Sequence, residues 1–162
     1  MSENQLRKLS IAVGQKLQAR GQWITCAESC TGGGIAKAIT DIAGSSAYFD
    51  RGFVTYSNAA KHELLGVAEA TLKMHGAVSE DVVREMAQGA LKAAKADLAL
   101  SVSGIAGPDG GSDEKPVGTV WFGFAERSGR VQAHKRQFAG DRDAVRLQAT
   151  IFALQMALDE FL

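Results

Sequence analysis

A short run of small and hydroxyl-bearing residues is the first place where chemistry can be expected. The run Glu28-Ser29-Cys30-Thr31-Gly32-Gly33-Gly34 follows a brief β-rich segment and precedes an apolar helical pattern. Backbone N–H groups exposed at such a strand-to-helix turn favour an anion or a developing oxyanion. The run lacks both the Gly-Lys-Ser/Thr of a P-loop and the glycine spacing of a dinucleotide fingerprint. A tight turn with a capping serine or threonine explains the same residues, so both interpretations stay open.

Ser29 can act as a nucleophile only if a neighbouring group accepts its proton. No histidine stands in an obvious position for this task, and Lys61 is the alternative, since a lysine becomes a base when its pKa is lowered. We expect Lys61 in the first turn of a helix, where the helix dipole disfavours a positive charge and lowers the pKa. A solvated surface lysine is the competing interpretation.

Two arginines, Arg142 and Arg146, lie one helical turn apart at the start of the last predicted helix. The dipole repels cations at that end unless an anion is present, so the pair suggests a clamp for a phosphate or a carboxylate. Asp141 and Asp143 offer the alternative of local ion pairing.

Composition narrows the function classes. The chain has 162 residues, of which 46% are hydrophobic and 22% charged, and this predicts one soluble globular domain over residues 1–162. Its 18 basic and 18 acidic side chains balance, which gives no global reason to bind nucleic acid or an acidic membrane. No apolar run is long enough for a bilayer and no secretory signal is recognisable, so we expect a cytoplasmic protein.

The cysteines and histidines form no pattern typical of a metal or redox site. Cys26 and Cys30 are separated by three residues, which matches neither a C-x-x-C pair nor a zinc set, and the three histidines are scattered. We therefore expect reduced, structural thiols and neither a metal nor an organic cofactor.

Helical and strand patterns alternate along the chain, which predicts an α/β fold with a mixed sheet. Helices are predicted over 5–19, from 34 to about 44, from Ser57-Asn58 onward, from Ser79 to about 96 and from Gly140-Asp141 to the end. Strands are predicted over 23–27, 50–56, 97–103, 117–125 and 130–138, the last two joined at Ser128-Gly129.

Two further segments point to function or assembly. Residues 104–116 contain both prolines and no apolar period, which predicts a long loop of the kind that is more often functional than idle. The last helix is apolar over most of its circumference, and a subunit interface is the simplest explanation for that. Tyr56, Ser57 and Asn58 end a predicted strand, where they can orient a polar ligand or simply form a turn.

Several uncommon strings, in this order, resemble the CinA C-terminal-domain family, and the resemblance covers nearly the whole chain. The strings are Ala27-Glu28-Ser29-Cys30-Thr31-Gly32-Gly33, Gly44-Ser45-Ser46, Gly52-Phe53-Val54-Thr55-Tyr56-Ser57-Asn58 with Lys61, Gly76-Ala77-Val78-Ser79, Ser103-Gly104-Ile105-Ala106-Gly107-Pro108-Asp109-Gly110-Gly111, Lys115-Pro116-Val117-Gly118-Thr119-Val120 and Gly140-Asp141-Arg142.

The resemblance implies a function and a fold. Stand-alone members of that family are amidohydrolases that convert nicotinamide mononucleotide to nicotinate mononucleotide and ammonia in pyridine nucleotide recycling. The implied fold is a three-layer α/β/α sandwich with a mixed sheet, the implied assembly is a homodimer, and no cofactor is implied. Ser29 would attack the carboxamide and Lys61 would carry the proton, with a water attack assisted by Lys61 as the rival mechanism.

The resemblance also implies which residues bind the substrate. Backbone N–H groups around Thr31 to Gly33 would hold the oxyanion, and the two arginines would hold the phosphate. The complete expected set is Glu28, Thr31, Gly32, Gly33, Ser46, Tyr56, Ser103, Gly104, Arg142 and Arg146. A nucleotide-binding module without catalysis and a thiol redox protein are the competing function classes.

Overall fold

The central sheet has five strands in the order β2-β1-β3-β4-β5 in the computed structural model, which describes residues 2–162. The strands are β1 (Ile24–Glu28), β2 (Phe53–Val54), β3 (Leu98–Gly104), β4 (Thr119–Glu126) and β5 (Val131–Gln137). Strands β2, β1 and β3 run parallel, whereas β3, β4 and β5 pair antiparallel. The sheet is therefore mixed, as predicted.

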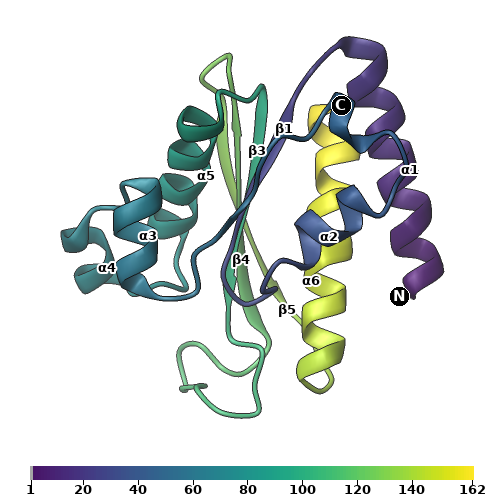
Figure 1. Cartoon of the computed structure of the whole chain (residues 1–162). Coiled ribbons are helices and arrows are strands. Elements are labelled where there is room, and N and C mark those ends of the chain that lie inside the picture. Colours follow the sequence, from purple (N-terminus) through teal and green to yellow (C-terminus); the bar gives the residue numbers. More distant parts are fainter. Residues whose placement is uncertain (1) are drawn as a thin grey trace.

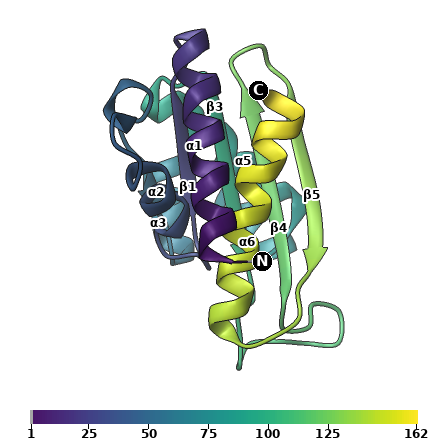
Figure 2. The ribbon, with the colours of Figure 1, turned by 90° about the vertical axis from the view of Figure 1, so that its right-hand side faces the viewer.

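Helices cover both faces of this sheet (Figure 1). One layer holds α1 (Glu3–Arg20), α2 (Gly34–Thr40) and α6 (Arg142–Met156), and the other holds α3 (Asn58–Leu65), α4 (Glu69–His75) and α5 (Glu80–Ala94). Figure 2 shows α1 and α6 side by side on their face. A 3-10 turn over Ser45–Ala47 and a π-helical turn over Ala157–Phe161 complete the elements. The expected three-layer α/β/α sandwich is confirmed.

Alternation along β4 explains why both faces are covered. Phe122 and Phe124 are buried in the cluster of α1, α2 and α6, whereas Trp121 packs on the cluster of α5. Successive side chains of a strand point to opposite faces, so one strand supplies both cores. The ring of Phe122 lies 4.5 Å from that of Phe152 on α6.

Side-chain caps fix the starts of the longer helices. Hydroxyl or carboxylate oxygens of the capping residues accept a backbone N–H in the first turn of α1, α3, α5 and α6; the caps are Ser2, Ser57, Ser79 and Asp141. Three of these starts were predicted from sequence. Most predicted boundaries lie within two residues of the observed ones, which is the usual uncertainty of helix and strand ends.

Three elements differ from the prediction. Helix α4 was missed because it buries only Leu72 and has no side-chain cap, so its sequence carries no apolar period. Strand β2 has only two residues instead of the seven predicted, and α2 ends at Thr40 rather than near Gly44.

The apolar circumference of α6 is largely covered within the chain. Its buried residues Val145, Ile151 and Leu154 belong to the core shared with α1 and α2, and Phe152 packs against the same core. Helix α6 packs beside α1 and α2 on one face of the sheet, and this packing covers much of its apolar circumference. A subunit interface for this helix stays a prediction. Over residues 2–162, no helix is both long and apolar enough to cross a bilayer.

Candidate functional site

Six of the twelve predicted site residues meet at one end of the sheet. The carboxyl ends of β1 and β3, the amino end of α6 and the loop over 105–118 all lie there (Figure 1). Crevices outside the carboxyl ends of parallel strands are where α/β folds place ligands. A pocket of about 250 Å³ opens at this end, lined by Ser29, Cys30, Tyr56, Lys61, Ala77, Val78, Ser103, Gly104, Ala106 and Arg142.

Ser29 and Lys61 are in direct contact inside the pocket. The Nζ of Lys61 lies 3.1 Å from the Oγ of Ser29 and also donates to the carbonyl of Thr55 at 2.8 Å and of Tyr56 at 3.3 Å. Ser57 caps α3 and thereby sets where Lys61, four residues later, projects. A nucleophile and a base within hydrogen-bond reach are the pairing that covalent catalysis requires.

Lys61 is buried, with 1% of its surface exposed, so the interpretation as a solvated surface lysine is wrong. Burial lowers the pKa of its ammonium from 10.5 to about 8, because the charged form loses hydration. The lowered pKa agrees with the prediction, but its main physical cause is desolvation and not the helix dipole. About a tenth of the lysine is then neutral at pH 7 and able to accept a proton.

Glu28 does not face the pocket, although it was expected to bind substrate. Its carboxylate is fully buried and accepts from the Thr31 hydroxyl at 2.5 Å and from the backbone N–H of Ile35 and Ala36 at 2.8 and 3.0 Å. The N–H groups at the start of α2, where an external anion could have bound, therefore donate to the protein's own Glu28. Glu28 holds the Ser29 loop against α2 instead of contacting a ligand.

The loop after Ser29 is a tight turn. Gly32 and Gly33 adopt φ values of 58° and 101°, a left-handed region that favours glycine, and the Gly32 N–H donates to the Ser29 carbonyl at 3.0 Å. The turn interpretation is thus confirmed for this segment. The N–H of Thr31 has no acceptor among residues 2–162.

The two arginines do not form one clamp. Arg142 lines the pocket, where it donates to the Gly107 carbonyl at 2.8 Å and to the Tyr56 hydroxyl at 3.2 Å. Arg146 lines a different hollow of about 490 Å³ between α1, α2 and α6. The sequence placed both on one helix end, but the Ser29 loop separates their guanidinium groups.

Ser46 lies away from the pocket of its own chain. It is exposed in the 3-10 turn over Ser45–Ala47. The next residue, Tyr48, accepts a hydrogen bond from the Ile24 N–H, so this turn lies at the amino end of β1. Ser29 follows the carboxyl end of the same strand. Ser46 therefore does not line the pocket as expected, whereas Tyr56, Ser103 and Gly104 do.

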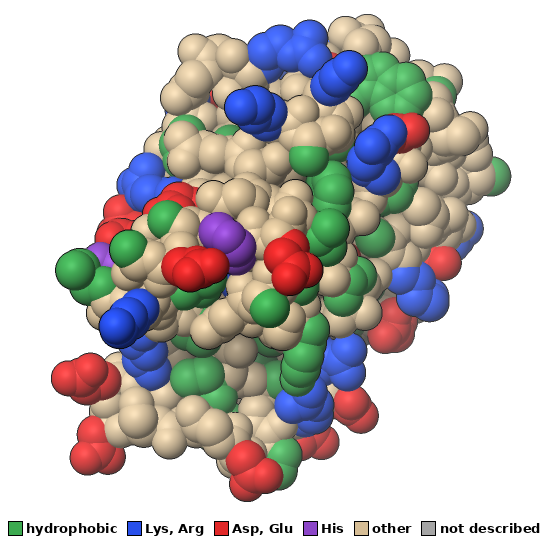
Figure 3. All heavy atoms as spheres, turned by 60° about the vertical axis from the view of Figure 1, so that its left-hand side comes forward, with side chains coloured by type: hydrophobic (Ala, Val, Ile, Leu, Met, Phe, Trp, Pro, Cys, Tyr) green, Lys and Arg blue, Asp and Glu red, His purple; other side chains and the backbone are tan. Residues whose placement is uncertain are grey.

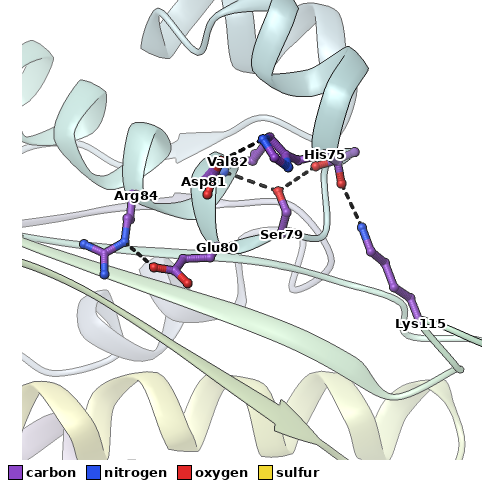
Figure 4. Close-up of polar contacts among 8 residues, drawn as sticks. His75, Ser79, Glu80, Asp81, Val82, Arg84 and Lys115 are labelled. Carbon is purple, nitrogen blue, oxygen red and sulfur yellow. Dashed lines mark hydrogen bonds and ion pairs between the residues drawn. The ribbon is translucent and has the colours of Figure 1, made fainter.

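Sequence reasoning missed the wall formed by Ala77 and Val78. Figure 4 shows how this turn between α4 and α5 is held: the Ser79 hydroxyl donates to the Gly76 carbonyl at 2.8 Å, and His75 pairs with Asp81 at 2.8 Å. Lys115, from the long loop, donates to the His75 carbonyl at 2.8 Å. Apolar wall residues carry no chemical signature, so only their place in a quoted motif marked them.

The thiols and the acidic groups offer no competing centre. Cys26 and Cys30 are free and buried, and burial raises the pKa of Cys30 to about 12 and that of Cys26 well above its usual value. Reactive cysteines have lowered pKa values, and neither of these thiols has one. Within residues 2–162, no group of three or more His, Cys, Asp or Glu side chains is arranged to hold a metal ion.

Another hollow, of about 380 Å³, lies between α3 and α4 and lacks the serine and lysine pair. It is lined by Asn58, Ala59, His62, Glu63, Glu69, Leu72 and Lys73. Figure 3 shows side chains of both charge signs on this side of the molecule, and His62 pairs there with Glu69 at 3.3 Å. The contact between nucleophile and base therefore distinguishes the pocket around Ser29.

Comparison with known sequences identifies the family of this chain. The family model of the CinA C-terminal domain matches residues 6–161. A protein of Enterobacter agglomerans named nicotinamide-nucleotide amidohydrolase PncC is 73% identical over 162 residues, covering 100% of this chain and 99% of that protein. The protein of the same name from Escherichia coli strain K12 is 65% identical, covering 100% of this chain and 98% of that one.

Solved structures agree with the fold. The crystal structure of competence/damage inducible protein CihA from Agrobacterium tumefaciens superposes with a TM-score of 0.93 at 45% identity, over 96% of each chain. A competence damage-inducible protein A from Klebsiella pneumoniae gives a TM-score of 0.93 at 44% identity, again over 96% of each chain.

Proposed function

The chain belongs to the CinA C-terminal domain family, and on this premise we propose that it is an amidohydrolase that deamidates nicotinamide mononucleotide to nicotinate mononucleotide and ammonia in pyridine nucleotide recycling. The names of its relatives in Enterobacter agglomerans and Escherichia coli support the substrate. The observation that carries the chemistry is the 3.1 Å contact between the Lys61 Nζ and the Ser29 Oγ.

The first half of the reaction is acyl transfer to Ser29. Neutral Lys61 accepts the Ser29 proton as the Oγ forms a bond to the carboxamide carbon, whose carbonyl oxygen becomes an oxyanion. The protonated Lys61 then gives a proton to the amide nitrogen, the C–N bond breaks, and ammonia leaves. The carbonyls of Thr55 and Tyr56 accept hydrogen bonds from the ammonium of Lys61 and orient it toward the Ser29 Oγ and the amide nitrogen of the substrate.

The second half releases the acid. Lys61 is neutral again after ammonia has left, so it can take a proton from a water molecule that attacks the acyl carbon. Collapse of the second tetrahedral intermediate breaks the bond to the Ser29 Oγ and returns the proton to it. Direct attack of a Lys61-assisted water on the amide is the rival mechanism, and it forms no bond to Ser29.

Arg142 anchors the substrate in this proposal. Arg142 is exposed, and among residues 2–162 its guanidinium donates to two neutral oxygens, the carbonyl of Gly107 and the hydroxyl of Tyr56. A phosphate is a stronger acceptor for a guanidinium than either of these, since both partners are charged. The 5′-phosphate of the substrate therefore has a partner at the mouth, while Ser103 and Gly104 line the interior.

The test is ammonia release from nicotinamide mononucleotide by the purified protein without added metal, with Ser29→Ala and Lys61→Ala alongside. Release that both variants lose supports the proposal. Absence of release, together with a raised melting temperature in the nucleotide, would favour a binding module instead, because a ligand stabilises the folded state whether or not it reacts.

The homodimer and the cytoplasmic location stay predictions. Val54, Tyr56 and Leu64 are large apolar side chains that are more than half exposed near the site, which is consistent with a covered surface in an assembly. Sedimentation velocity over a range of protein concentrations tests the dimer.

A further inference from the structure

Arg146 donates hydrogen bonds to the carbonyls of the two residues that follow the nucleophile. Its Nε donates to the Cys30 carbonyl at 3.1 Å and its Nη2 to the Thr31 carbonyl at 3.3 Å. A Cβ on Gly32 would lie only 2.8 Å from the same Nη2. The guanidinium therefore contacts the Ser29 loop from the hollow between α1, α2 and α6.

The geometry of a peptide bond turns this contact into an orientation. In a planar trans peptide the C=O and the following N–H point in opposite directions. Because the Cys30 carbonyl is held by Arg146, the Thr31 N–H points away from Arg146. That N–H has no acceptor among the described residues 2–162.

The next peptide differs in one respect. The Thr31 carbonyl also accepts from the Gly34 N–H at 3.0 Å, and the Gly32 N–H donates to the Ser29 carbonyl at 3.0 Å. Both ends of that peptide are thus satisfied within the turn. Only the Cys30–Thr31 peptide combines a carbonyl held by Arg146 with an unused N–H.

We propose that Arg146 is a positioning residue, which holds the Cys30–Thr31 peptide so that the Thr31 N–H can donate to the oxyanion formed when Ser29 attacks the amide. The inference rests on the proposed function and deepens it. It replaces the phosphate role expected for Arg146 from sequence, since its Nε and Nη2 are occupied by carbonyls in a hollow other than the pocket.

Electrostatics favours the same role. A guanidinium stays charged at any working pH, and its charge opposes the burial that raises the pKa of the neighbouring Cys30 thiol. The fixed positive charge of Arg146 next to the loop also stabilises the negative charge of the proposed oxyanion. Preorganised donors of this kind stabilise the transition state more than the bound substrate.

Steady-state kinetics of Arg146→Gln separates the two roles. A lost oxyanion donor lowers kcat on the order of 100-fold and leaves KM nearly unchanged. The same loss is expected with nicotinamide riboside, which has the amide but no phosphate. A rise in KM that disappears with the riboside would assign Arg146 to the phosphate and overturn the inference.

Arg146→Lys is the second variant, and it keeps the charge. One ammonium cannot reproduce the fork that reaches two carbonyls, so we expect only partial recovery of kcat. Full wild-type kcat in this variant would show that charge alone matters and would overturn the positioning role. Arg7→Gln, which removes an exposed arginine of α1, controls for the loss of one surface charge.

Amide hydrogen exchange gives a readout that does not depend on activity. We expect Arg146→Gln to exchange faster over residues 30–34 while the protection of β1 and β3 stays as in the wild type. Unchanged protection over 30–34 would overturn the inference even if the wild type hydrolyses the nucleotide. A wild-type protein that releases no ammonia would instead overturn the proposed function, and the exchange data would still decide whether Arg146 orders the loop.

Discussion

Arg142 and Tyr56, 86 residues apart in the chain, meet where the pocket opens, with the Nη2 of the arginine 3.2 Å from the tyrosine hydroxyl. Arg142 begins α6 and Tyr56 lies between β2 and α3, so this hydrogen bond joins the start of α6 to the segment that connects β2 with α3. A ligand anion that takes the guanidinium must compete with the tyrosine hydroxyl and the Gly107 carbonyl. Substrate binding and the arrangement of these two side chains are therefore coupled.

Removing Arg142 should weaken binding rather than chemistry. Arg142→Gln is expected to raise KM for nicotinamide mononucleotide about 10- to 100-fold, which corresponds to the loss of a charge-assisted hydrogen bond. Steady-state kinetics with the mononucleotide and the riboside checks this. The variant and the wild type should have similar KM values for the riboside, and an equal rise for both substrates would rule out the phosphate as the partner.

Activity should fall in acid with the titration of Lys61. The base must be neutral to accept a proton, so kcat is expected to rise about tenfold per pH unit below the pKa of about 8 and to level off above it. The pH profile of kcat, compared with that of residual activity in Lys61→Ala, measures this. An acidic limb centred near pH 4 would point to a carboxylate and contradict the assignment.

Acylation of Ser29 separates the two mechanisms. Rapid acid quenching during turnover should trap a nicotinoyl nucleotide ester on the peptide that contains Ser29, detected by mass spectrometry. Ser29→Ala gives the matched blank. If no adduct forms while Ser29→Ala still turns over, attack by water is the route.

Glu28 should matter for stability. Glu28→Gln places an NH₂ group among four donors, which include the Cys26 thiol, so at least one of them loses its acceptor. The free energy of unfolding is expected to drop by about 1–3 kcal/mol, measured by urea denaturation. Glu69→Gln, at an exposed carboxylate in α4, is the control and should change it little.

The thiols should be dispensable. A redox reaction between two cysteines needs both sulfurs, and Cys26 lies outside the pocket. Cys26→Ala is therefore expected to keep ammonia release, at a modest cost in stability from the lost buried atom. Loss of activity in a variant that remains folded would reopen the redox hypothesis.

Local signals in the sequence sufficed for most of the fold. The caps at Ser57, Ser79 and Asp141 and the turn at Ser128-Gly129 act within a few residues, and the strand and helix periods report which faces are buried. Helix α4 escaped because it buries too little apolar surface to leave a period, and β2 was predicted too long. The expected amidohydrolase function came from the family resemblance, because no local pattern in the sequence indicates it.

The tertiary structure alone decided what each site residue does. Burial turned Lys61 into a candidate base, aimed Glu28 at α2, and put Arg142 and Arg146 on opposite sides of the Ser29 loop, while Ser46 fell at the far end of β1. Desolvation and hydrogen-bond geometry depend on atoms brought from distant parts of the chain. Sequence spacing determines which residues share an element, but the packing of elements determines which of them share a pocket.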